Sequence, residues 1–287
     1  MPLTSLADQV CVGWYKPCMT TEATSGSASA VRSGVHEGVA TVTLTRPQRL
    51  NAINHQLLIE LRDALLEMGG RRDVRAVVLA GEGRAFCAGL DLDAGLADPA
   101  VDDPVEAMQA GMQAGAAVTW AMRTIPQPIV AAVQGHAVGA GFAFAAAADV
   151  RLVGPDARFS APFLRLGMTV GDFGLSWLLP RIIGTGRASH LFLSAGVLDA
   201  EQAVACGLAA GVSADPLAAA TELAAELAGQ PVYGVQASKR LLDAGLGSSL
   251  RDHLEAEARA QAIGALTGAA QSAMAEAVAA TRRREPN

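Results

Sequence analysis

The chain has 287 residues, of which 51% are hydrophobic and 17% charged, so it can build a packed core and is not a disordered protein. Its net charge of −6 argues against nucleic-acid binding, which needs a clustered basic surface. No apolar stretch reaches the roughly 18 residues of a membrane span, and residues 1–30 lack the pattern of a secretory signal.

Residues 1–30 show no hydrophobic period and end in small and hydroxylated residues, which predicts a flexible N-terminal extension. The alternative is an arm packed on a neighbouring subunit, because Trp14 and Tyr15 are worth burying. The cysteines have no zinc-binding spacing and indicate reduced thiols in a cytoplasmic protein. They are Cys11, Cys18, Cys87 and Cys206.

Strands and helices alternate from residue 39 onward. An alternating β-branched pattern predicts a strand over 39–44, and continuous apolar runs predict strands over 74–80, 129–133 and 150–153. Apolar residues spaced by three or four follow the first strand and predict a helix that Asn54 caps.

The segment 91–104 carries five aspartates and two prolines and is expected to be a loop before a helix over 105–123. A glycine-rich turn then opens an alanine-rich helix that ends near residue 148, and a short helix is expected around 176–181. Beyond Gly184 the chain is predicted to be helical, with one long helix over 251–284. The fold class is therefore α/β with a helical C-terminal region.

Two glycine-containing turns follow predicted strands, at residues 85–91 and 135–141. The second lacks the G-x-G-x-x-G spacing, which disfavours a dinucleotide site. A helix start leaves backbone N–H groups unpaired and carries positive potential. One N–H group from each turn could hold a carbonyl oxygen that gains negative charge, which is an oxyanion hole made from backbone alone.

Four segments in this order carry a resemblance to a known family. They are Asn-Ala-Ile-Asn at 51–54, Ala-Phe-Cys-Ala-Gly-Leu-Asp at 85–91, Gly-His-Ala-Val-Gly-Ala-Gly at 135–141, and Asp-Phe-Gly-Leu-Ser-Trp-Leu-Leu-Pro-Arg at 172–181. With this order and spacing the chain resembles the crotonase family, the enoyl-CoA hydratases and isomerases, over about residues 31–284.

The resemblance implies a spiral of ββα repeats over 31–195 that binds acyl-CoA, and a helical oligomerisation region over 196–287. It also implies homotrimers or homohexamers, an acyl-CoA thioester substrate, no metal, and no cofactor beyond the coenzyme A of the substrate. By the same resemblance, the N–H groups of Ala88 and Ala140 hold the thioester oxygen. The neighbouring residues expected to bind substrate are Gly89, Leu90, Asp91, Gly139 and Gly141.

The sequence departs from the family pattern at the two glutamates that place and split water in hydratases. Ala143 and Phe163 stand at those positions, and neither side chain can take a proton. Asp172 lies where certain isomerases and dehalogenases of the family carry an acid, and a single carboxylate suffices to move a double bond. Its alternative role is to cap the helix that starts near Phe173.

A pocket lined by Phe163, Phe173 and Trp177 is expected to raise the pKa of Asp172 and improve it as a base. Arg84, and more weakly Lys239, are candidates to meet a phosphate of coenzyme A, whereas a catalytic role is disfavoured for His136 and Cys87. Three functions stay open: an enoyl-CoA isomerase acting through Asp172, a hydratase or other lyase with unusual acids, and an inactive acyl-CoA-binding protein.

Overall fold

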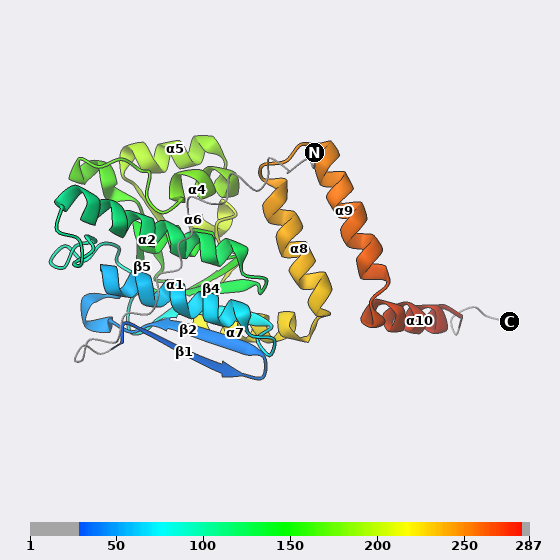
Figure 1. Ribbon diagram of the computed structural model, residues 1–287. Helices are drawn as coiled ribbons and strands as arrows, with labels where there is room; N and C mark the ends of the chain where they lie inside the picture. The colour runs from blue at the N-terminus through cyan, green and yellow to red at the C-terminus, as the bar shows by residue number, and fades with distance from the viewer. Residues whose placement is uncertain (1–28, 283–287) are drawn as a thin grey trace, which may run out of the picture.

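A computed structural model describes the backbone of residues 29–282 and the side chains of 29–278 (Figure 1). The predicted extension, Cys11 and Cys18 therefore lie outside the described residues, apart from the last two positions of that extension. Ala30 is 3% exposed within the core. Ser29 donates through Oγ to Glu60 at 2.8 Å. The packed body therefore includes residues 29 and 30.

A six-stranded sheet forms the base of the fold, in the order β1-β2-β3-β4-β6-β9. β1 pairs antiparallel to β2, and the other neighbours are parallel. Three predicted strands match the structure residue for residue, and the fourth starts two residues later than predicted. The strands are β1 Val31–His36, β2 Val39–Leu44, β3 Ala76–Gly81, β4 Ile129–Val133, β6 Val150–Val153 and β9 Gly211–Val212.

A second layer of short strands lies beyond the carboxyl ends of the base strands. It contains β5 His136–Val138, β7 Arg158–Ser160 and β8 Val197–Asp199. Two parallel bridges continue this layer towards the N-terminus, Cys87 to Ala137 and Ile53 to Leu90. The chain thus repeatedly crosses the base sheet, enters the second layer and then forms a helix, which confirms the expected spiral of ββα repeats.

Seven α-helices and two short 3-10 helices complete this body, and a side chain caps the start of four of the α-helices. Asn54 accepts from the Leu57 N–H at 3.0 Å. Asp199 and Gln202 form a reciprocal capping box at the start of α6. The helices are α1 His55–Gly70, α2 Pro104–Thr124, α3 Ala140–Ala147, α4 Leu175–Ile183, α5 Thr185–Ser194, α6 Ala200–Ala205, α7 Pro216–Gly229, η2 Pro47–Arg49 and η3 Pro162–Leu166.

The central strands β3 and β4 are covered on both faces and are therefore apolar throughout. Along β3, Val77 and Leu79 face the main core. Val78 and Ala80 face the opposite side, where they pack with Ala220 of α7. Because α7 and strands β8 and β9 belong to this body, the α/β core extends well past its predicted end at residue 195.

Three helices extend from one side of the body as an arm (Figure 1). They are α8 Val232–Gly245, α9 Leu250–Ala265 and α10 Gly268–Arg282. The prediction of one long helix over 251–284 is wrong, because Thr267 interrupts it and accepts from the Ala270 N–H at 3.3 Å, starting a new helix. None of the helices described over 29–282 is long and apolar enough to cross a membrane.

A buried ionic network joins the arm to the body. Lys239 of α8 is 6% exposed, with Nζ 2.9 Å from the carboxylate of Asp149, at the end of α3. Arg123 of α2 lies 2.6 Å from Asp243 of α8 and 3.5 Å from Asp149. Burial lowers the pKa of Lys239, although the charge of Asp149 opposes this shift. The start of the arm is therefore fixed to both α2 and α3.

Candidate active site

The turn at residues 85–91 is held in place by the Asn-Ala-Ile-Asn segment. Asn51 has a left-handed backbone with φ +55°. Its buried side-chain amide donates to the carbonyls of Glu82 at 3.0 Å and Ala85 at 2.8 Å. Its side-chain oxygen accepts from the Arg46 N–H at 2.9 Å. This motif therefore supports the turn instead of touching a substrate.

Asp91 also supports the turn, which corrects its predicted role in binding substrate. The carboxylate is buried and lies 2.7 Å from the guanidinium of Arg46. It also accepts from the N–H groups of Asp93 and Ala94. Burial alone would raise the pKa of Asp91, but the hydrogen bonds from Arg46 and the backbone outweigh it, and the pKa is lowered. The Asp91 carboxylate is therefore charged and already bonded to Arg46 and to the backbone, so it is not available to a substrate.

The second turn leads from β5 into α3. Gly139 precedes the helix with φ +53°, a backbone conformation that a side chain would strain. Ala140 is the first helical residue, so its N–H group has no partner within the helix. Among the described residues no other acceptor reaches this N–H group, which lies at the positive end of the helix dipole.

Glycines allow the two turns to approach each other more closely than side chains would permit. A Cβ atom on Gly89 would lie 2.8 Å from the carbonyl oxygen of Val138. A Cβ atom on Gly141 would lie 2.4 Å from the carbonyl oxygen of Cys87. Next to these two contacts, Cys87 and Ala137 form a parallel β-bridge. The two predicted turns therefore lie side by side.

The structure disfavours Ala88 as the donor of the first turn and makes Leu90 the candidate in its place. The N–H group of Ala88 already donates to the carbonyl of Leu50 at 3.0 Å, so it is not free to hold a ligand. Ile53 bonds to the residues on both sides of Leu90. In a parallel pair this pattern turns the N–H group of Leu90 away from Ile53, towards the second turn.

A backbone bulge explains why this donor was missed. Gly89 has φ +88°, which breaks the alternation of N–H directions along the strand. As a result, Leu90 faces the same side as Cys87, the side of β5 and α3. No acceptor for the Leu90 N–H group is found within the described part of the chain. The sequence predicted that Leu90 binds substrate as a residue of this turn, but it predicted Ala88, and not Leu90, as the N–H donor.

Asp172 lies near the first turn. The residue is 9% exposed, and burial raises the pKa of its carboxyl to about 6. No side-chain hydrogen bond to the carboxylate exists among the described residues. Burial, chiefly, and also the nearby charge of Asp172 raise the pKa of Cys87 to about 12. The carboxylate is therefore close to the first turn and free to take a proton.

The capping role for Asp172 is not what the structure shows. The residue that precedes α4 is Gly174, with φ +85°, and no side chain caps this helix. Asp172 instead precedes two residues in left-handed conformations, Phe173 at φ +44° and Gly174. Such a conformation costs a non-glycine residue about 1–3 kcal/mol, and strain of this kind tends to cluster at functional sites.

The residues that replace the two family glutamates form apolar surroundings. Ala143 is fully buried within α3, and Phe163 is 8% exposed. The Phe163 ring lies against the start of α3, because a Cβ atom on Gly139 would be 3.4 Å from it. Trp177 does not join this lining as predicted. It is 44% exposed, and the guanidinium of Arg181 lies 3.9 Å from its ring centre.

The two candidates for phosphate binding, Arg84 and Lys239, differ in their exposure and in their partners. Arg84 is exposed at the start of the first turn, and no described residue pairs with it. Lys239 is buried in the ionic network and is not available to a ligand, which corrects that expectation. Asp149 accepts from the Ile129 N–H at 2.8 Å, which is a structural role. No cluster of metal-ligating side chains occurs among residues 29–278.

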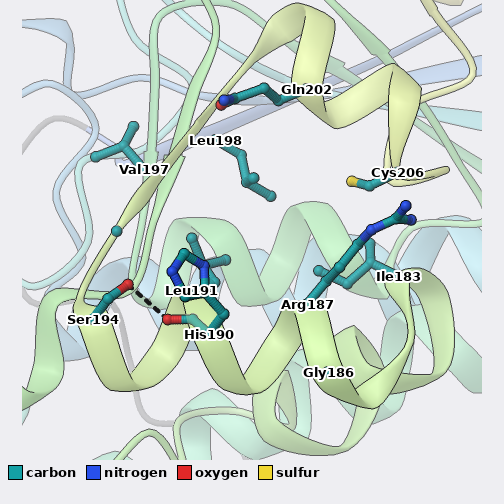
Figure 2. Close-up of a pocket in the computed structure, with 11 residues that line it drawn as sticks. Ile183, Gly186, Arg187, His190, Leu191, Ser194, Val197, Leu198, Gln202 and Cys206 are labelled. Atoms are coloured by element: carbon teal, nitrogen blue, oxygen red, sulfur yellow. Dashed lines mark hydrogen bonds between the residues drawn. The ribbon is translucent and has the colours of Figure 1, made fainter.

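A separate hollow of about 350 Å³ lies between α5, β8 and α6 (Figure 2). Arg187 and His190 line it from α5, and Gln202 and Cys206 line it from the opposite side. None of the predicted site residues belongs to its lining. This hollow is therefore distinct from the site around Asp172.

Comparisons with known proteins agree with the fold and with the order of the motifs. A model of the enoyl-CoA hydratase/isomerase family matches residues 34–275. "Probable enoyl-CoA hydratase EchA14" of Mycobacterium tuberculosis is 42% identical over 210 residues, which is 73% of this chain and 80% of that protein. "1,2-epoxyphenylacetyl-CoA isomerase" of Escherichia coli is 35% identical over 232 residues, 79% and 87% of the two chains.

Solved structures show the same architecture. The crystal structure of an enoyl-CoA hydratase from Mycobacterium smegmatis has a TM-score of 0.79 and 26% sequence identity, and the match covers 90% of this chain and 98% of that one. The fold is thus the crotonase-like spiral. The chain belongs to the enoyl-CoA hydratase/isomerase family, whose members act on acyl-CoA thioesters.

The burial of Asp172 predicts an unusual dependence of stability on pH. Its pKa is about 6 in the folded protein against 3.8 ordinarily, so folding loses stability as pH rises from about 4 to about 6. Asp172→Asn abolishes this loss. We expect it to raise the free energy of unfolding by up to about 3 kcal/mol near neutral pH, with little effect near pH 4. Urea denaturation across this pH range measures the difference.

Asp102→Asn is the matched control, because Asp102 is exposed on the loop before α2. We expect it to leave the free energy of unfolding nearly unchanged across the same pH range. A gain for Asp172→Asn that is equal at every pH would contradict the assignment, because it would not come from titration of this carboxyl group.

Proposed function

We propose that this acyl-CoA enzyme is an isomerase that moves the double bond of an enoyl-CoA, with Asp172 as its single acid–base group. The observation that carries the proposal is a buried carboxylate, without a hydrogen-bond partner among the described residues, whose charge acts on Cys87 of the first turn. A base with a pKa of about 6 is largely deprotonated at neutral pH and can still return its proton.

In the proposed reaction the thioester oxygen accepts hydrogen bonds from the N–H groups of Leu90 and Ala140. Asp172 takes the proton from C2 of a 3-enoyl-CoA, and the electron pair moves onto the thioester oxygen as a dienolate. The same carboxyl group then gives the proton to C4, which leaves a double bond between C2 and C3. No water, metal or cofactor beyond the coenzyme A of the substrate takes part.

The surroundings of Asp172 favour this reaction over hydration. Adding water to a double bond requires groups that bind water and move its proton, and Ala143 and Phe163 offer none. An apolar pocket also shields the dienolate from side reactions with water. Similar proteins carry names of both kinds, probable enoyl-CoA hydratase and 1,2-epoxyphenylacetyl-CoA isomerase, so the assay must score both reactions.

For the rest of the substrate, we propose that the glycine turns and Phe163 contact the thioester and the acyl group. Gly89 and Gly141 allow the two turns to approach each other, and the Phe163 ring lies beside Gly139. Arg84, at the entrance of the first turn, is the side chain that we propose to meet a phosphate of coenzyme A. Its charge and freedom from an intramolecular partner support this role.

We also propose that the chain forms homotrimers or homohexamers through its arm. Large apolar side chains of the arm are exposed, including Leu242 at 75%, Leu250 at 75% and Leu266 at 76%. Apolar patches of this kind usually mark interfaces. Light scattering at micromolar concentration should give the mass of three or six chains. A stable monomer would contradict the proposal.

Replacing the proposed base tests the chemistry directly. Asp172→Asn preserves the shape of the side chain but removes the base, so we expect isomerisation to fall by about 10²–10⁴-fold. The affinity for acyl-CoA should change little, because the N–H donors are untouched. Steady-state assays with 3-enoyl-CoA substrates of several chain lengths measure the rate, and titration calorimetry measures the affinity.

Three results would overturn the isomerase proposal. Parent-like isomerisation by Asp172→Asn would exclude a single-carboxylate mechanism. Rapid hydration of a 2-enoyl-CoA by the parent protein would instead identify a hydratase with unusual acids. Tight binding of acyl-CoA without either reaction would identify an inactive binding protein. Asp102→Asn serves again as the control and should retain the parent rate.

The two proposed donors can be tested without catalysis. The saturated thioester butyryl-CoA has no double bond to move, so its complex is stable for measurement. We expect the amide proton resonances of Leu90 and Ala140 to move downfield when its carbonyl oxygen accepts their hydrogen bonds. The Ala88 amide, already bonded to Leu50, should move much less. A large shift at Ala88 and none at Leu90 would restore the original assignment.

A further inference from the structure

The direction of Asp172 depends on a strained backbone immediately after it. Phe173 and Gly174 both have left-handed conformations, at φ +44° and +85°. Before Asp172, the residues 167–171 are exposed or only half-buried. On this side, the Asp172 N–H donates to Val170 at 3.1 Å, the Met168 N–H donates to Phe163 at 2.9 Å, and Val170 packs partly on the core. The residues that follow Asp172 are packed more deeply.

Helix α2 supplies a slot for the ring of Phe173. A Cβ atom on Gly115 would lie 2.2 Å from two ring atoms, so only glycine leaves room for this ring. On its other side the ring stacks on Phe144 of α3, with centroids 5.8 Å apart and planes 8° from parallel. Phe173 is 4% exposed as a result. The side chain is thus fixed between the two helices.

Thr119, one helical turn after Gly115, fixes the backbone of the same residue. Its hydroxyl donates to the carbonyl oxygen of Phe173 at 2.7 Å. Its methyl group lies beside Gly174, because a Cβ atom on Gly174 would be 3.4 Å from Thr119 Cγ2. The hydroxyl therefore holds the peptide group that joins the two left-handed residues.

We propose that Thr119 is a positioning residue for Asp172, which it orients through the carbonyl group of Phe173. When this hydrogen bond is lost, the strained peptide can relax, and the carboxylate turns away from the glycine turns towards water. Thr119 itself touches no reacting atom. The role in catalysis rests on the proposed function, whereas the orientation of Asp172 is a property of the protein alone.

Thr119 can be tested with a closely matched pair of variants. Thr119→Val keeps the shape and removes the hydroxyl, and Thr119→Ser keeps the hydroxyl. We expect kcat of Thr119→Val to fall roughly 10- to 100-fold with little change in KM, as misplaced catalytic groups do. Thr119→Ser should restore most of the rate. Thr124→Val is the control. The Thr124 hydroxyl also donates to a backbone carbonyl at 2.7 Å, but that carbonyl belongs to Trp120 in the same helix.

A titration separates positioning from general structural damage. The carboxyl carbon resonance of Asp172 should titrate near 6 in the parent, in Thr119→Ser and in Thr124→Val. In Thr119→Val it should titrate about one unit or more lower, towards the ordinary value of about 3.9, because the group has become solvated. The acidic limb of the pH profile of kcat/KM should move with it.

Each result supports or overturns the inference. Parent-like kcat and titration in Thr119→Val would show that the hydroxyl does not orient Asp172. An equal loss of rate in Thr119→Val and Thr119→Ser, with the titration still near 6, would show a merely structural role. If Asp172→Asn retains activity, the proposed function fails, yet the titration of Thr119→Val still decides whether Thr119 orients the carboxylate.

Discussion

The site depends on the close approach of two backbones. Gly89 lies against the carbonyl of Val138, and Gly141 lies against the carbonyl of Cys87, at distances that no Cβ atom could accept. The strands pair at Cys87 and Ala137, and beyond this pair neither the Leu90 nor the Ala140 N–H group has an acceptor among the described residues. The base sheet and the ββα spiral serve to bring these short segments together.

The arrangement that we propose is a polar anion site in an otherwise apolar setting. The donors are backbone groups, which have no side-chain freedom to lose and are already oriented before a ligand arrives. The carboxylate beside them carries its own cost, because burial disfavours its charge. The surrounding network of Arg46, Asn51 and Asp91 fixes the first turn without contributing a reactive group. Rigidity and reactivity are thus provided by different residues.

Much of the fold could be predicted because its signals are local. Each of these signals depends on residues that are close together in the sequence. Examples are the apolar runs at β4 and β6, the cap at Asn54 and the capping box at Asp199. The short strands of the second layer were not predicted, because three residues carry no period. The break at Thr267 was also missed, since the alanine-rich sequence on both sides is equally suited to a helix.

The position of the candidate site could be predicted from the sequence, but the directions of its backbone N–H groups and side chains could not. Glycines at 89 and 141 marked the two turns, and Asp172 was the remaining acid. The choice between Ala88 and Leu90, however, depends on a bulge at Gly89 that reverses the direction of one peptide group. Likewise, the occupation of Asp91 and Lys239 by buried partners depends on segments far apart in the chain. Such pairings arise only when the chain is folded.

The ionic network at the base of the arm has a consequence for the order of assembly. Detaching α8 would leave Asp149 and Arg123 without Lys239 and Asp243, the partners that α8 supplies. The first helix of the arm is therefore held in place by its own body before any other chain arrives. A second chain would meet a preformed apolar surface on a rigid support, and would not have to order this helix as it binds.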